Sequence, residues 1–91
     1  MPSRQDVVKA FEEGQRCQGS SALWTDGTKL YSYETVILQR LDDHSIVANI
    51  TKYSHTTSVH QSIARVRQHV AHKQLDSVPR GTADLAPLLR L

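Results

Sequence analysis

Residues 53–73 read YSHTTSVHQSIARVRQHVAHK, and this stretch decides how the rest of the chain is interpreted. Its apolar residues Val59, Ile63, Val66 and Val70 follow one another at intervals of four, three and four positions. That spacing is typical of one face of an α-helix. Hydroxyl residues, which cap helices well, stand just before them. We therefore predict a helix over residues 57–73 whose apolar face packs on a sheet.

The residues before this helix carry the signals of antiparallel strands. Asp26-Gly27 lies between residues 22–25 and 28–33 and is typical of a tight hairpin turn. Residues 28–41 are apolar on both alternating faces, which indicates a central strand or one bent midway. Residues 45–53 alternate apolar and polar side chains. We predict three antiparallel strands in this part of the chain.

An amphipathic helix is predicted over residues 4–17. Ser3 and Asp6 suit a helix start. One apolar stripe follows at helical spacing and ends at Cys17 before Gly19. The expected fold is α+β in the order α-β-β-β-α, with one small three-stranded antiparallel sheet packed against the second helix. The residues expected in the core are Phe11, Ile37, Ile46, Ile50, Val59, Ile63, Val66 and Val70.

The length of 91 residues fits one small domain. We place it at residues 1–75, followed by a tail at 76–91 that contains Pro79, Gly81 and Pro87. The single Cys17 fits a reducing cytoplasm. No apolar run approaches a membrane span and no targeting segment is recognised, so we expect no membrane partner.

Positive charge gathers toward the C-terminal end, although the chain as a whole is only +2. Residues 55–91 hold five Lys and Arg against two Asp, a net +3. An asymmetry of this kind can mark a face that binds a polyanion. The polar side of the predicted helix adds side chains that read bases or hold phosphates. These candidate nucleic-acid-binding residues are Gln61, Arg65, Arg67, Gln68, His72 and Lys73. The alternative is a solvated helix face.

The junction before this helix is the most unusual run in the chain. Its residues of interest are Tyr53, Thr56, Thr57, Ser58, His60 and Gln61. Free amides at a helix start can hold a phosphate. The favoured interpretation is architectural: Thr57 or Ser58 caps the helix, while Tyr53, His60 and Gln61 tie the strand end to the helix start.

Catalytic and metal-binding patterns are weak. Ser54, Ser58 or Cys17 could pair with a histidine, but no nucleophile signature fixes such a pair. His69 and His72 lack a third ligand. We expect no enzymatic activity, no metal and no cofactor.

Three runs of the sequence resemble a known family. They are Gly19-Ser20-Ser21 with Trp24, then Ser32-Tyr33-Glu34-Thr35-Val36-Ile37, then the run from Tyr53 to Gln61. The chain resembles, over residues 11–70, a family of short uncharacterised domains found mainly in bacteriophages and related bacterial mobile elements. Glu34 departs from the small or amide residue expected there. The resemblance implies a phage-type accessory protein in a bacterial host cytoplasm and no particular activity.

We therefore expect a nucleic-acid-binding domain, for DNA or RNA, that uses the basic face of helix 57–73. The alternative is a module that binds a host protein and modulates a host process. A domain of this size often gains stability by forming a homodimer. Leucines of the tail would then dock on their own domain or exchange with a partner chain; they are Leu85, Leu88, Leu89 and Leu91.

Overall fold

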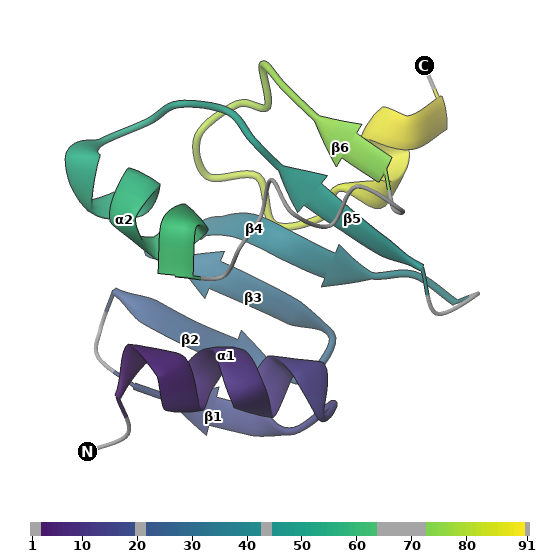
Figure 1. The fold of residues 1–91 in the computed structure, drawn as a ribbon. Helices are drawn as coiled ribbons and strands as arrows, with labels where there is room; N and C mark the ends of the chain where they lie inside the picture. Colours follow the sequence, from purple (N-terminus) through teal and green to yellow (C-terminus); the bar gives the residue numbers. More distant parts are fainter. Residues whose placement is uncertain (1–2, 20–21, 43–44, 64–72, 91) are drawn as a thin grey trace.

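The structure, a computed structural model, describes residues 3–19, 22–42, 45–63 and 73–90. Its elements are α1 (Arg4–Glu12), β1 (Arg16–Gln18), β2 (Leu23–Asp26), β3 (Lys29–Ser32), β4 (Thr35–Arg40), β5 (Ile46–Asn49), α2 (His55–Ile63), β6 (Lys73–Leu75) and the 3-10 helix η2 (Ala86–Arg90). Figure 1 shows the helices and the C-terminal segment arranged around a single sheet.

Within the described residues, the sheet has six strands in chain order, β1-β2-β3-β4-β5-β6. All neighbours pair antiparallel except β5 and β6, which pair parallel. The expected three-stranded antiparallel sheet is therefore wrong, although the chain does combine helices and strands. A parallel pair needs a crossover connection, and the segment containing α2 provides it.

The first helix is shorter than the sequence predicted. Ser3 caps it as expected: its hydroxyl accepts from the amide of Asp6, and its own amide donates to the Asp6 carboxylate. The helix then ends at Glu12, and Gly14 takes a φ of +73°, which turns the chain away from the helix. Cys17 consequently lies in β1 rather than in the predicted helix 4–17.

Two tight turns connect the strands β2, β3 and β4. The predicted Asp26-Gly27 turn joins β2 to β3, and Gly27 has a φ of +98°. A Cβ at Gly27 would lie 2.7 Å from the carbonyl oxygen of Gly14, so glycine is required there. The second turn joins β3 to β4 at Tyr33 and Glu34, where a single continuous strand region had been expected.

A bulge explains why β4 is apolar on both faces. Leu30 pairs with Leu38, but Tyr31 pairs with Val36, so Ile37 is an extra residue in β4. Ile37 and Leu38 both join the core cluster under α1. Both faces of the sheet are covered, and apolar residues of either parity are therefore buried.

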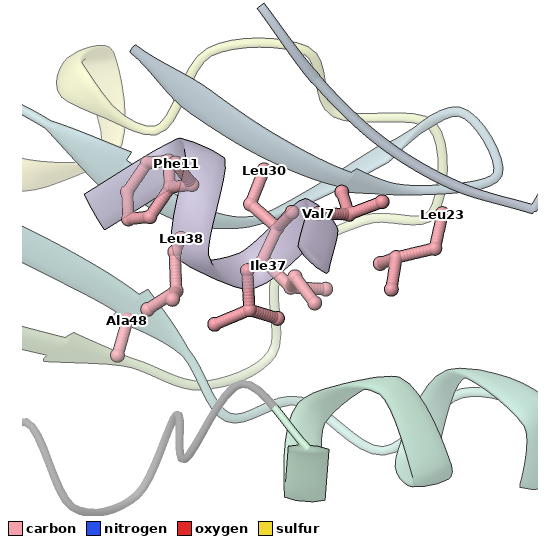
Figure 2. Packing of buried hydrophobic residues seen from close by; sticks show 8 residues of the cluster. Val7, Phe11, Leu23, Leu30, Ile37, Leu38 and Ala48 are labelled. Atoms are coloured by element: carbon pink, nitrogen blue, oxygen red, sulfur yellow. The ribbon is translucent and has the colours of Figure 1, made fainter. Parts of the chain in front are cut away.

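The larger core cluster lies between α1 and the sheet. Figure 2 shows Val7 and Phe11 of α1 directed toward the strand residues Leu30, Ile37 and Leu38. Phe11 and Ile37 are fully buried as predicted. Ile46, Ile50 and Ile63 pack on this cluster but are only partly buried, and Val59 is also partly buried. Val66 and Val70 lie outside the described residues.

The opposite face of the sheet is covered by the C-terminal segment. Val78 and Leu85 are buried beside Tyr31, Val36 and Val47. Leu88 and Leu89 pack against the same cluster and are partly buried. Within the described part of the chain, the segment from 76 onward therefore packs on its own domain.

The predicted helix 57–73 differs from the structure at both ends. The structure describes α2 as beginning at His55 and continuing to Ile63, and it places Lys73 in β6. A strand at Lys73 excludes a helix that runs through this residue. Lys73 pairs with Val47 in the parallel strand pair β5–β6. A residue that the helical spacing had included is therefore part of the sheet.

Candidate functional site

A cavity of about 400 Å³ opens where the β3–β4 turn meets the start of α2. Five hydroxyl residues line it, and we call it the hydroxyl cavity: Ser32, Thr35, Ser54, Thr56 and Thr57. Two tyrosines, one carboxylate and one guanidinium complete the lining: Tyr33, Tyr53, Glu34 and Arg80. Three segments far apart in sequence thus build one polar site.

The start of α2 forms one wall of the cavity. The hydroxyl of Ser54 accepts a hydrogen bond from the amide of Thr57 at 3.2 Å, and the Ser54 carbonyl accepts from the amide of Ser58. Ser54 is therefore the helix cap, and the prediction that Thr57 or Ser58 has this role is wrong. Both of those residues lie inside the helix, so their amides need the cap rather than supply it.

Ser32 is the least exposed of the described residues that line the cavity, and we call its position the base of the cavity; its neighbour His60 is fully buried and is not part of the lining. The Oγ of Ser32 is 2.7 Å from Nδ1 of His60 and 3.1 Å from Oγ1 of Thr57. The hydroxyl of Ser54 lies 3.2 Å from the same Thr57 oxygen. These contacts connect the end of β3 to the first two turns of α2 through side chains alone.

The imidazole of His60 is fully buried. Burial lowers the pKa of His60 below its ordinary value, and the charge of Arg4 lowers it further. His60 is therefore neutral at neutral pH. Its Nε2 has no hydrogen-bond partner among the described residues, which is uncommon for a buried polar atom.

The turn at the mouth of the cavity is strained. Tyr33 has a φ of +57°, a conformation that non-glycine residues rarely adopt. Its side chain is 49 % exposed, and among the described residues it is the one large hydrophobic side chain that is exposed rather than buried or partly buried. Backbone strain at such a position persists only where the surrounding structure holds it. Here the amide of Tyr33 donates to the carbonyl of Ala22, and its carbonyl accepts from the indole of Trp24.

The other tyrosines are used inside the domain. Tyr31 stacks on Trp24 with ring centroids 4.0 Å apart and is 9 % exposed. The hydroxyl of Tyr53 donates to the backbone carbonyl of Val78 and accepts from the side-chain amide nitrogen of Asn49. Of the three tyrosines, all of which the structure describes, Tyr33 is therefore the one with an exposed ring for stacking on a ligand.

The junction residue Gln61 is directed into the domain. Its side-chain amide donates to the carbonyl oxygens of Asn49, at 2.7 Å, and Thr51, at 3.0 Å. The donors that a glutamine would offer to an adenine edge are thus occupied at the end of β5. Thr56 lines the cavity, and Ser58 is partly buried in α2.

Lys73, another candidate nucleic-acid residue, is not part of the cavity lining. Lys73 is exposed on β6, and Arg65, Arg67, Gln68 and His72 lie outside the described residues. The cavity is also lined by residues that were not predicted as site residues from the sequence: Ser32, Tyr33, Glu34, Thr35 and Arg80. Ser32 and Glu34 belong to a run that carried the family resemblance, but no sequence signal connected Arg80 to it.

Among the described residues, no group of three or more His, Cys, Asp and Glu is arranged to hold a metal ion. No helix in the described ranges is long and apolar enough to cross a membrane.

Comparison of the chain with protein-family models, curated proteins and solved structures found no match.

Proposed function

We propose that this domain binds single-stranded nucleic acid at the mouth of the hydroxyl cavity. The observation that carries the proposal is the exposed ring of Tyr33, held in a strained turn beside a cavity that Arg80 also lines. Single-strand binding combines an aromatic platform for bases with cationic groups for the backbone. The net +3 of residues 55–91 supports the same interpretation.

The start of α2 supplies the second part of the phosphate site. A helix N-terminus carries free amides and a partial positive charge, both of which favour an anion. Thr56, in the first turn, and Arg80, from the C-terminal segment, line the same cavity. A backbone phosphate between these groups would leave the neighbouring base beside Tyr33.

The proposed binding site, the mouth of the hydroxyl cavity, differs from the face of helix 57–73 that was expected from the sequence. Gln61 uses its amide donors inside the domain, so it is a poor base reader. The alternative, a module that binds a host protein, would use the same exposed face of helix 57–73 or the leucine-rich tail. Leu85 of that tail is buried against the sheet, so its side chain is not exposed to a partner.

Fluorescence anisotropy with labelled DNA and RNA oligonucleotides, measured across a salt series, tests the proposal. Neutralisation of one backbone phosphate by Arg80, the one Lys or Arg among the described residues of the lining, predicts a slope of about −0.7 when the logarithm of the association constant is plotted against the logarithm of salt concentration. Arg80→Ala should weaken binding and make the slope shallower by about 0.7, because one phosphate contact is lost. Arg16→Ala is the matched control, since Arg16 is exposed and pairs with Asp26 at the other end of the sheet.

Two results would reject the proposal. One is a flat titration at low salt with both DNA and RNA. The other is equal binding by the wild-type protein and the Arg80→Ala variant, which would move any nucleic-acid site away from the cavity.

A further inference from the structure

The proposed nucleic-acid site does not use the buried pair Ser32 and His60 at the base of the hydroxyl cavity. Ser32 is 1 % exposed and His60 is fully buried, and Ser32 still lines the cavity. The 2.7 Å between Ser32 Oγ and His60 Nδ1 is within the range expected of a nucleophile and its general base. From the sequence, Ser54 and Ser58 were the serines that could pair with a histidine, and nothing indicated Ser32.

The surroundings of His60 suit a base. Burial and the charge of Arg4 on α1 keep the imidazole neutral at neutral pH, so one ring nitrogen carries a free electron pair. Among the described residues, the ring of Tyr33 also lies near the imidazole, with its centroid 6.1 Å away. When the free pair is on Nδ1, it accepts the Ser32 proton.

We propose that Ser32 is a nucleophile toward small carboxylic esters and that His60 is the base that takes its proton. The cavity volume of about 400 Å³ restricts the substrate to a compact ester. This activity would use the base of the cavity, whereas nucleic acid would bind at its mouth, so either proposal can fail without the other.

The reaction has two halves. In the first, the Ser32 oxygen forms a bond to the ester carbonyl carbon as its proton passes to His60 Nδ1. The carbon–oxygen bond to the alcohol then breaks, and His60 returns the proton to the departing alkoxide. In the second half, water attacks the acyl-Ser32 ester and gives its proton to His60. The carboxylic acid leaves as the Ser32 oxygen takes that proton back.

The first turn of α2 is placed to stabilise the negative charge that develops on the carbonyl oxygen. Thr57 Oγ1 lies 3.1 Å from Ser32 Oγ, so this turn contacts the nucleophile directly. The amide of Thr57 is used by the Ser54 cap. The amides of His55 and Thr56 precede it and have no partner within the helix, which makes them the candidate donors to the oxyanion.

Incubation of the full chain with p-nitrophenyl acetate tests the proposal. We expect release of nitrophenolate and an acetyl group on Ser32, located by peptide mass mapping. His60→Asn keeps a hydrogen-bonding group near Ser32 but removes the base, and should slow acetylation about 100-fold or more. Ser58→Ala and Cys17→Ala should react like the wild type, because neither residue lines the cavity.

The pH profile separates a base from a merely structural histidine. With His60 as the base, the acetylation rate of the wild type stays level from pH 8 down to about its ordinary pKa of 6.5, and falls only below it. In His60→Asn the rate should instead rise steadily with pH.

Three outcomes would overturn the proposal: no acetyl group on wild-type Ser32 at pH 8, acetylation only at other residues, or a wild-type rate in His60→Asn. The mapping uses the wild-type protein, so the test does not depend on whether Ser32→Ala folds.

Discussion

The side-chain oxygen of Gln39 accepts a hydrogen bond from the backbone amide of Leu85 at 2.7 Å, although 46 residues separate them. The side-chain nitrogen of the same glutamine donates to the carboxylate of Asp84 at 2.8 Å. One buried side chain of β4 thus holds the C-terminal segment at two adjacent residues. Leu85 consequently inserts into the second core cluster.

Leu85→Ala should destabilise the protein by about 2–5 kcal/mol, because Leu85 is fully buried and its loss leaves a cavity. Urea unfolding followed by circular dichroism measures the change. Leu89→Ala is the matched control and should cost less, since Leu89 is only partly buried. Equal stability of Leu85→Ala and the wild type would contradict the docked position of the C-terminal segment.

Ser54→Ala should lower the free energy of unfolding by about 1 kcal/mol, since it removes the hydroxyl that accepts from the amide of Thr57. Ser58→Ala is the control, because it removes the same hydroxyl group from a residue inside α2 rather than at its start. It should have a smaller effect in the same thermal or urea unfolding experiment. A larger loss of stability in Ser58→Ala than in Ser54→Ala would identify Ser58 as the cap.

Tyr33→Gly should separate stability from binding. Glycine adopts a φ of +57° without strain, so the free energy of unfolding should stay within about 1 kcal/mol of the wild type. Oligonucleotide affinity should fall at least about fivefold, because an aromatic platform contributes roughly 1–3 kcal/mol per stacked base. Unchanged anisotropy titrations would show that Tyr33 does not contact the nucleic acid.

Glu34→Gln should increase oligonucleotide affinity. The carboxylate of Glu34 lines the same cavity as Arg80 and repels a phosphate there. The gain should be about two- to fivefold at low salt and should shrink as salt screens the charge. Glu12→Gln removes an exposed carboxylate at the end of α1 and serves as the control. A loss of affinity in Glu34→Gln would place the ligand elsewhere.

His60 should make stability depend on pH. Its pKa in the folded protein is lower than the ordinary 6.5 because the imidazole is buried. The unfolded chain therefore binds more protons as the pH falls through 6.5, and stability decreases until the folded pKa is reached. Between pH 7 and pH 5, wild-type stability should fall relative to His60→Asn, by no more than about 1.4 kcal/mol per pH unit. Parallel urea unfolding curves for the two proteins at every pH would contradict a buried neutral His60.

Several features could be predicted because they depend on neighbours in the chain. The Ser3 cap and the Asp26-Gly27 turn follow from contacts over two to four residues. The burial of Phe11 follows from the apolar stripe of one helix. Such features have the same physical basis in any protein, since the backbone preference and the hydrogen bond lie within one turn.

Other features were misjudged because long-range contacts override local preference. Neither Tyr33 nor Glu34 favours a turn, yet β3 and β4 reverse there because Ser32 pairs with Thr35. Cys17 continues a helical stripe but lies in β1, where it pairs with Thr25 of β2. A residue such as Cys17 can adopt either a helical or a strand conformation, and pairing with the neighbouring strand determines which one forms.

By itself the sequence determined the helix start at Ser3, the hairpin turn at Gly27 and the mixed helix–strand character of the chain. Only the tertiary structure decided the six-stranded order, the bulge at Ile37 and the meeting of Ser32 with His60. That last contact joins residues 28 positions apart, and no local preference encodes it. It exists because burying both faces of the sheet brings α2 against the end of β3, where the hydroxyl and the imidazole satisfy one another away from water.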